Sequence, residues 1–346
     1  MEKRKNTGFV LFFNSYRAYI FLAIVLLFGI FAENFYTLFN IKSILSSSAL
    51  YTFIGLGFTT CMIAGHMDLS VGYMATTGAI VALGMKTLSG LPWVAAILIT
   101  VGVGIVIGII NGLLVTKAKI HSFIVTLGMQ FVLRGGMYIY CNGAEISVKG
   151  DYGLTDFLSS SPIKFLPFNW IFIITFLCVA IFAVVLAKTR LGRNIHMLGG
   201  NLETAWLAGI NSDRATILVF VLSSAICAFG GALFGINQGT ATPTLGEKGI
   251  APLMIALTAT IIGGTDIAGG KGKVTDTFIS ILAINAMFGV VTTIIGKYEM
   301  QVLLIGLVLA ACVIYETYAN YQKQKILGIR QELVNKYMQE TGKSKL

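Results

Sequence analysis

A succession of long apolar stretches constrains the fold of this chain more than any other feature. Ten of them occur along the 346 residues, at 19–32, 49–65, 71–85, 91–116, 120–141, 170–187, 216–235, 250–267, 277–295 and 300–315. A helix that crosses a bilayer needs about 20 mostly apolar residues. Because backbone groups inside lipid must pair with one another, helices are the favoured way to cross. The pattern therefore predicts an all-α polytopic membrane protein with about ten transmembrane helices.

The composition argues against two other broad classes of protein. Hydrophobic residues make up 56% of the chain and charged residues 12%, whereas soluble domains carry about 25% charged residues. A disordered chain would need low hydrophobicity and high charge. The five cysteines are scattered singly and lack metal-type spacing, which is typical of packing residues. The surplus of apolar side chains is expected to face lipid.

The basic residues indicate how the chain is oriented. The net charge of +10 would suggest nucleic acid as a partner of a soluble protein. Here Lys and Arg gather in the tails and in the short segments between apolar stretches, so no nucleic-acid partner is expected. With the N-terminus inside, the inner segments hold eighteen Lys and Arg residues and the outer segments hold six. The positive-inside rule then predicts that both termini are cytoplasmic.

This orientation divides the chain into one membrane domain and two tails. Residues 1–17 form a cytoplasmic N-terminal tail, residues 18–315 the transmembrane domain, and residues 316–346 a cytoplasmic C-terminal tail. The longest inner loop is 188–214, and the longest outer segment is 142–167. Neither is large enough for a folded domain.

Motifs for catalysis or nucleotide binding are absent from the sequence. The segment that comes nearest to a phosphate-binding loop is 264–272, but Thr265 stands where the first Gly is needed and Gly272 where Ser or Thr is needed. Its glycines are better interpreted as a tight turn at a helix end. We therefore expect no catalytic residue, no metal and no cofactor in this chain, and we interpret it as a non-enzyme.

The inner loop 188–214 predicts a short helix. Asn201 is a suitable N-cap for a helix that starts at Leu202, and Glu203 would then lie in the first turn. Small residues follow at helical spacing, namely Ala205, Ala208 and Gly209. Such a helix suits docking in a groove of another protein. It equally suits an amphipathic position on lipid headgroups.

A polar stripe is predicted on the stretch 120–141. Phe123, Thr126, Gln130 and Arg134 recur at spacings of three and four residues, so they share one helical face. Hydroxyl-binding groups beside an aromatic ring suit a polar solute, and an ionisable residue inside a membrane is a functional candidate. Hydrogen bonds between helices and snorkelling of Arg134 to the interface are the competing interpretations.

Two further polar residues are candidates for the pathway. Asp68 lies between apolar stretches and is flanked by Gly65 and Gly72, so a broken helix could present it to a solute. The favoured interpretation of Asp68 is an N-cap for a helix starting near Leu69. Asn111 is a tentative pathway residue, although a contact between helices is the commoner role for such an amide.

Several motifs carry a resemblance to a known family. The sequence Glu203-Thr204-Ala205-x-x-x-Gly209 resembles the EAA-type coupling motif of ABC importer permeases. Residues 190–195 and 199–203 around it are similar to the ribose/galactose-type, or simple-sugar, permeases. Three other segments resemble motifs of that family, GHMDLSVG at 65–72, SFIVTLG at 122–128 and IGGTDIAGGKG at 262–272. The departures, such as His66-Met67 for Gly-Ile, leave the identity of the solute open.

The resemblance implies a set of partners and roles. It implies a multi-pass permease of a prokaryotic cell membrane that pairs with a second permease copy or paralogue. It also implies an ABC ATP-binding subunit, which holds ATP and magnesium, and an extracytoplasmic solute-binding protein. The residues that would couple to the ATPase are Arg190, Arg193, Glu203, Thr204, Ala205 and Gly209.

Two alternatives remain beside a sugar importer. Related ABC permeases carry nucleosides, autoinducers or branched-chain amino acids on a similar scaffold. A secondary transporter driven by an ion gradient would usually need carboxylates within its spans. The chain has few of these apart from Asp68 and Asp276 at helix ends.

Overall fold

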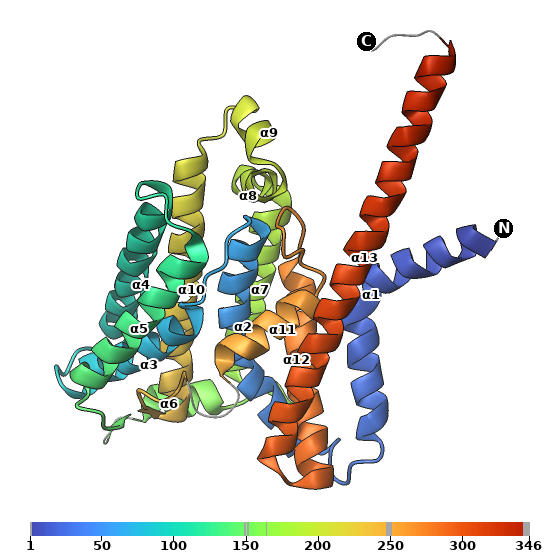
Figure 1. The fold of residues 1–346 in the computed structure, drawn as a ribbon. Helices are drawn as coiled ribbons and strands as arrows, with labels where there is room; N and C mark the ends of the chain where they lie inside the picture. The colour runs from blue at the N-terminus through green and yellow to red at the C-terminus, as the bar shows by residue number, and fades with distance from the viewer. Residues whose placement is uncertain (1, 149, 151, 164, 247–250, 342–346) are drawn as a thin grey trace.

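The computed structural model describes residues 2–148, 150, 152–163, 165–246 and 251–341, which form a bundle of helices (Figure 1). Each predicted apolar stretch contains a helix. These helices are α1 (Glu2–Gly29), α2 (Leu38–Ile63), α3 (Val71–Thr87), α4 (Trp93–Thr116), α5 (Ser122–Tyr140), α7 (Trp170–Lys188), α10 (Ser212–Gln238), α11 (Pro252–Ile262), α12 (Val274–Ile295) and α13 (Tyr298–Thr341). Shorter elements lie between them, namely β1 (Ile146–Ser147), α6 (Gly153–Ser159), α8 (Arg190–Gly200), α9 (Leu202–Leu207) and β2 (Thr240–Ala241).

The helical membrane class is confirmed, but the number of spans is not. In the described part of the chain, seven helices are long and apolar enough to cross a membrane: α2, α4, α5, α7, α10, α12 and the first half of α13. The apolar part of α1 (Tyr16–Gly29), the 17 residues of α3 and the 11 residues of α11 are shorter than such a span.

The short helices α3 and α11 follow irregular backbone that lies inside the bundle. Residues 64–70 connect α2 to α3 through two turns and a short irregular stretch, and residues 242–246 lead toward α11. The helix α3 is buried from Val71 to Gly84. The first turns of α3 and α11 meet, because a methyl group on Gly72 would lie 3.4 Å from Cβ of Leu253. Irregular backbone is tolerated at membrane depth when protein surrounds it.

The core is built on α10, which packs against α2, α3 and α4. Glycines allow these backbones to approach closely. A Cβ on Gly231 of α10 would lie 1.9 Å from the carbonyl oxygen of Ala75, and one on Gly78 of α3 would lie 2.2 Å from that of Ala228. On α4 the glycines that face α10 recur every four residues, at Gly104, Gly108 and Gly112. No larger residue fits at these glycine positions without moving a helix.

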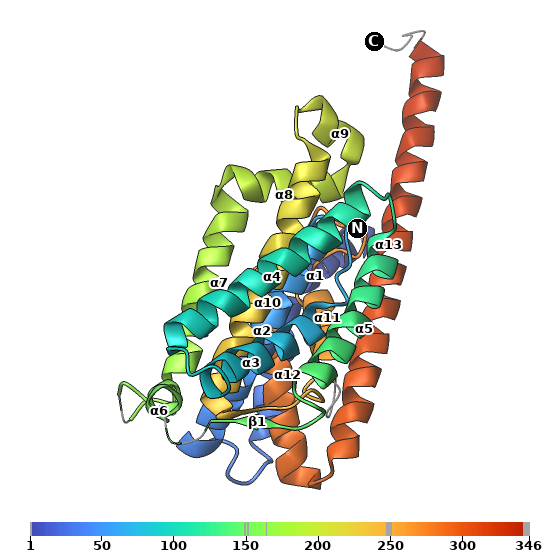
Figure 2. The same cartoon turned by 90° about the vertical axis from the view of Figure 1, so that its left-hand side faces the viewer.

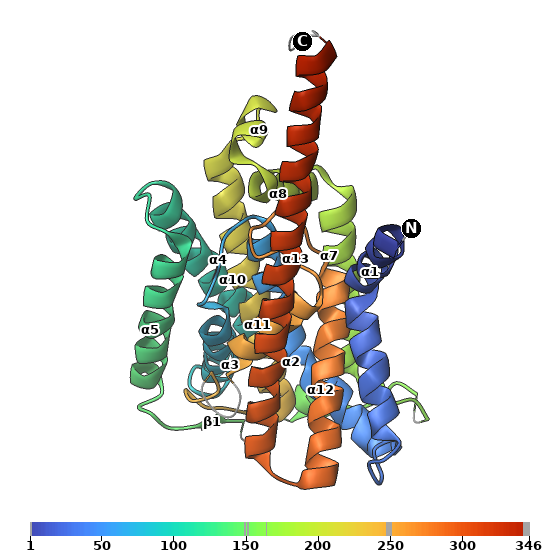
Figure 3. The same ribbon diagram turned by 45° about the vertical axis from the view of Figure 1, so that its right-hand side comes forward.

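The rim of the bundle is apolar and exposed. Only 6% of the α13 span and 28% of the α5 span are buried inside the chain. Figure 3 shows α5 and α13 on either side of one face, with α3 and α11 visible between them. Apolar exposed surface of this extent is expected for helices that face lipid or another membrane subunit.

The two ends of the bundle differ. One end carries α8 and α9, and the far turns of α13 extend beyond the bundle on that side (Figure 1). The other end carries α6 and the antiparallel pair β1–β2, in which Ile146 pairs with Ala241 and Ser147 with Thr240. The start of α1, the end of α13 and the loop 188–214 lie toward one end of the bundle (Figure 1). The boundary predicted at residue 315 is not a helix end, because α13 continues to Thr341.

Candidate functional site

Three of the motif segments meet where α2 ends. The amide of Gly270 donates a hydrogen bond to the carbonyl oxygen of Ile63 at 2.8 Å. The His196 ring Nδ1 lies 3.1 Å from the carbonyl oxygen of Gly270. A Cβ on Gly199 would lie 1.9 Å from the Ile63 oxygen, so only glycine fits there. We name the five glycines of this contact the glycine junction, and they are Gly65, Gly199, Gly200, Gly269 and Gly270.

The glycine junction depends on backbone conformations that other residues rarely adopt. Gly65, Gly269 and Gly270 have φ angles of +80°, +91° and +77°. The Asp266 carboxylate accepts a hydrogen bond from the Ala268 amide at 3.0 Å, and the Asp266 amide donates one to the Lys271 carbonyl at 2.9 Å. Segment 264–272 is therefore a tight turn after α11, which confirms the sequence interpretation.

Asp68 lies fully buried just before α3, where hydroxyl groups surround it. Its Oδ1 accepts hydrogen bonds from the Ser70 amide at 3.0 Å and the Ser70 hydroxyl at 2.5 Å. Its Oδ2 accepts one from the Ser223 hydroxyl of α10 at 2.9 Å. The Asn111 amide of α4 donates to the Ser70 oxygen at 3.3 Å. The carboxylate thus joins the start of α3 to α10, and Asn111 connects α4 to the same network through Ser70.

The predicted capping role of Asp68 is modified by the structure. The helix α3 begins at Val71 and Ser70 occupies its N-cap position, two residues later than the sequence suggested. Asp68 instead closes a turn immediately before the helix. Three hydrogen-bond donors compensate its charge, which is the requirement for burying a carboxylate without a cation.

The start of α5 holds the connecting segment 64–70 from the other side. The Ser122 hydroxyl accepts a hydrogen bond from the Met67 amide at 3.3 Å. The Thr126 hydroxyl accepts one from the Leu69 amide at 3.0 Å. Met67 and Leu69 lie between α2 and α3, and these two hydroxyl groups supply hydrogen-bond partners for their backbone amides. The fourth motif, at 122–128, therefore supports the backbone beside Asp68.

The predicted polar stripe on α5 is divided. Thr126 is fully buried against residues 67–69, whereas 43% of Phe123 is exposed. Gln130 and Arg134, one and two turns further along, are partly buried. Helical spacing placed these side chains on one face, but the neighbouring segment covers only part of it.

The predicted helix in the inner loop forms with the expected cap. The side chain of Asn201 accepts a hydrogen bond from the Thr204 amide at 3.0 Å, and α9 begins at Leu202. Gly209 follows the helix end with a φ of +75°. The surface that α9 presents differs from the expected smooth face of small residues, because Ala205 is buried. Its exposed residues are Leu202, Glu203, Thr204, Trp206 and Leu207.

The helix α8 was not predicted, although it connects α9 to the glycine junction. Thr189 caps it by accepting a hydrogen bond from the Gly192 amide at 3.3 Å. Leu191, Ile195 and Leu198 recur at helical spacing and pack toward the core, so a signal was present in the sequence. Arg190 and Arg193 lie on its exposed side. Sequence reasoning also missed His196, Ser70 and Ser223, whose roles depend on partners distant in the chain.

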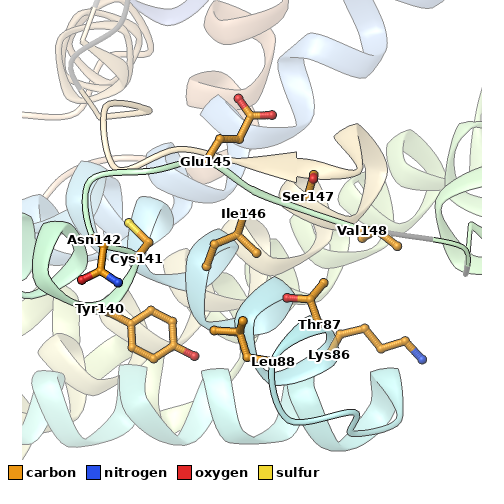
Figure 4. Close-up of a pocket in the computed structure, with 10 residues that line it drawn as sticks. All are labelled: Lys86, Thr87, Leu88, Tyr140, Cys141, Asn142, Glu145, Ile146, Ser147 and Val148. Atoms are coloured by element: carbon orange, nitrogen blue, oxygen red, sulfur yellow. The ribbon is translucent and has the colours of Figure 1, made fainter.

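The opposite end of the bundle has an open hollow of about 460 Å³. Figure 4 shows its lining, which includes Lys86, Tyr140, Asn142 and Glu145. None of the candidate pathway residues lines it. Among the described residues, no group of three or more His, Cys, Asp or Glu side chains is arranged to hold a metal ion.

A chain of direct contacts therefore connects the surface of α9 with the buried start of α3. It runs from α9 into α8, across the glycine junction to residues 63–66, and along the connecting segment 64–70 to Asp68. Hydrogen bonds and backbone contacts hold each step, and none of them presents a nucleophile or an acid–base pair. The geometry suits the transmission of movement between the surface and the membrane interior.

Comparisons with known proteins support the family resemblance that these motifs carry. Residues 40–313 match the family described as branched-chain amino acid transport system / permease component. The ribose import permease protein RbsC of Haemophilus influenzae is 30% identical over 310 residues, which cover 88% of this chain and 94% of that protein. The D-allose transport system permease protein AlsC of Escherichia coli is 32% identical over 313 residues, 90% of this chain and 94% of that protein.

A third relative, the L-arabinose transport system permease protein AraH of Escherichia coli, is 27% identical over 320 residues, covering 89% of this chain and 91% of that protein. None of the solved structures matches the chain significantly. Family members of this kind are transport components rather than enzymes. The chain is a multi-pass membrane protein that belongs to the family of ABC importer permeases, within the simple-sugar group that includes the ribose and allose permeases.

Proposed function

We propose that this chain is the membrane-spanning subunit of an ATP-driven importer that carries a sugar across a bacterial inner membrane. An extracytoplasmic binding protein would deliver the sugar to the end of the bundle that carries β1 and β2. The names of the relatives, which are permeases for ribose, allose and arabinose, support a sugar as the solute. The contact chain from α9 to Asp68 is the observation that carries the coupling mechanism.

In this proposal the ATP-binding subunit docks on α9. Leu202, Trp206 and Leu207 are 60%, 70% and 72% exposed, which is a large apolar area for so short a helix. Glu203 and Thr204 lie among them, and Arg190 and Arg193 on α8 extend the surface. Buried Ala205 and the turn at Gly209 fix the orientation of α9 on the bundle. ATP and magnesium belong to the partner, so the docked helix is the element that transmits closure of the ATPase.

Movement of α9 would reach the membrane interior through the glycine junction. The backbones there touch without intervening side chains, so a displacement of α8 is passed directly to residues 63–66. Asp68 would carry it to α3 and α10. ATP shifts the permease between two states only if the docked ATPase binds those states with different affinity.

The proposal also covers the orientation and the assembly. Ten crossings with both termini inside require that α1, α3 and α11 cross together with their flanking segments, and the burial of α3 is compatible with a short crossing inside protein. A second permease copy would pack on the face between α5 and α13, whose spans are 28% and 6% buried. Phe123, Gln130 and Arg134 on α5 would then line the pathway, with Asp68, Thr126 and Asn111 supporting its wall.

The test is transport in proteoliposomes with the ATP-binding subunit co-expressed. Glu203→Lys is expected to abolish ATPase co-purification and ATP-dependent uptake of labelled ribose, allose or arabinose, while the permease still elutes as a folded protein. Glu299→Lys is the matched control, because Glu299 is equally exposed at the opposite end of the bundle and should retain the ATPase. Normal assembly of Glu203→Lys would contradict docking on α9. Uptake without any ATPase would replace the proposal with an ion-coupled transporter.

The same vesicles distinguish the solute classes. Branched-chain amino acids are included as competitors because the family description names them, and nucleosides are included as a further class. Competition by unlabelled sugars alone is the expected result. Competition by leucine or by a nucleoside, without competition by sugars, would keep the importer but change its solute.

A further inference from the structure

The segment between α6 and α7 exposes an unusual number of large apolar side chains. Within residues 153–168, which we name the lateral segment, the exposed fractions are 45% for Phe157, 54% for Ile163, 89% for Phe165, 42% for Leu166 and 38% for Phe168. Three of these five side chains are aromatic. An apolar patch of this kind on a connecting segment marks an interaction surface.

The lateral segment is attached to the bundle through α6 and through the start of α7. Leu158 is buried in the core, and the Thr155 hydroxyl donates a hydrogen bond to the Ile236 carbonyl of α10 at 2.8 Å. The Trp170 amide donates to the Ser160 carbonyl at 3.1 Å. The rings of Phe157 and Trp170 stack with centroids 5.0 Å apart. These contacts fix the segment to the first turn of α7 and the last turns of α10.

The direction of the segment relative to the bundle identifies what covers it. Figure 2 shows it extending sideways past the end of α7, while α12 and α13 reach further along the bundle axis. It therefore projects within the layer occupied by the helix ends. On α7, the neighbouring exposed residues are also apolar, with Phe176 56%, Leu177 58% and Val184 58% exposed. The Phe168 ring stacks on the buried Phe172 of α7 with centroids 5.6 Å apart, which holds this end of the segment against α7.

We infer that the lateral segment is a membrane-interface anchor that places Phe157, Ile163, Phe165 and Phe168 among the lipid headgroups and upper acyl chains. One of the most apolar spans of the chain, α7, begins at Trp170, two residues after the segment ends. Phe and other large apolar side chains of interfacial segments insert at the boundary between headgroups and acyl chains, while adjoining polar groups stay hydrated. The anchor would fix the depth of α7 through Ser160, and that of α10 through Thr155. A binding protein would then dock elsewhere on this end of the bundle.

Tryptophan fluorescence tests the depth of the segment in the full chain. The Phe165→Trp variant is reconstituted in phosphatidylethanolamine/phosphatidylglycerol vesicles, with and without bromine on the acyl chains. Its emission is compared with that of the unsubstituted chain, which contains three tryptophans. The added emission is expected to lose most of its intensity in brominated lipid and little on adding iodide. Tryptophan is tolerable at this position because Phe165 is 89% exposed.

Glu145→Trp is the matched control, because Glu145 is exposed and lines the open hollow at the same end of the bundle. Its added emission should respond to iodide and not to brominated lipid. If Phe165→Trp gives that same aqueous response in a protein with unchanged elution, the inference is overturned. An aqueous Phe165 would instead favour a surface for a protein partner. The measurement needs neither the ATPase nor a solute, so it is independent of the proposed transport function.

Discussion

The centre and the rim of this bundle are built by different rules. In the central helices α2 and α10, 72% and 61% of the spanning residues are buried, against 6% in α13 and 28% in α5. The centre packs backbone against backbone through glycine, whereas the rim exposes large apolar side chains. Because the solvent of the rim is itself apolar, hydropathy alone does not separate the two groups. The fixed framework that connects α9 with α3 lies in the centre, and the surfaces left for lipid and subunits lie on the rim.

The largest expected effect comes from filling a glycine contact in the centre. Gly231→Val places a Cβ where the Ala75 carbonyl oxygen is 1.9 Å away, and backbone cannot move aside as a side chain can. Overpacking usually costs about 1–3 kcal/mol, and this site should exceed about 3 kcal/mol because neither helix can yield. Detergent-solubilised protein should show little folded material by size-exclusion chromatography, or a strongly lowered unfolding temperature.

Gly306→Val is the rim counterpart of that variant. Gly306 lies on α13, and a Cβ there would meet nothing within 4 Å. The unfolding temperature of the monomer should therefore stay unchanged. If Gly306→Val destabilised the monomer as strongly as Gly231→Val, the distinction between centre and rim would fail. A change confined to the dimer fraction would instead place α13 at the subunit contact.

A smaller effect is expected when the buried carboxylate of the centre is neutralised. Asp68→Asn removes the charge that accepts hydrogen bonds from Ser70 and Ser223, and its amide would point donors at donors. Hydrogen bonds to charged groups contribute about 1.5–3 kcal/mol each, so a loss of about 2–3 kcal/mol is expected. Thermal unfolding followed by a thiol-reactive dye suits the measurement, since Cys61 and Cys227 are buried nearby. The rate of uptake per folded protein should also fall, because Asp68 ends the contact chain.

Asp156→Asn provides the comparison for Asp68. Asp156 is exposed on α6, outside the central framework. Its neutralisation should leave both the unfolding temperature and uptake unchanged. Equal losses in the two variants would mean that the loss follows from reduced negative charge and not from the hydrogen bonds of Asp68.

Much of this division was predictable from the sequence. All ten apolar stretches contain helices, and the cap at Asn201 and the turn at Gly209 lie where local residue preferences placed them. Local rules fail where partners are distant. The spacing of Thr126 and Phe123 predicted a common face, but only the path of residues 67–69 decides which of them is covered. The stretch 71–85 was already short in the sequence, and α3 is short. The shortness of α11 was missed, because apolar residues in helices and in irregular backbone look alike in hydropathy.

The smallest predicted effect concerns the ion pair that ties the rim helix α13 to α1. Arg17 and Glu316 approach to 2.7 Å with side chains only 11% and 14% exposed. A double-mutant cycle of Arg17→Gln and Glu316→Gln should give a coupling energy of about 1 kcal/mol, in the range for partly shielded pairs in direct contact. The exposed pair Lys117–Asp213 has the same 2.7 Å separation but side chains 64% and 36% exposed.

The two ion pairs separate the contribution of distance from that of environment. If separation alone set the interaction, the two cycles would give equal coupling. Because water and salt screen the exposed pair, Lys117→Gln with Asp213→Asn should show no measurable coupling at physiological ionic strength. The coupling of Arg17 and Glu316 should persist when salt is raised, since protein shields both groups. A coupling that disappears in salt would show that water reaches this pair as freely as it reaches Lys117, and α13 would then be attached to the centre mainly through its apolar contacts.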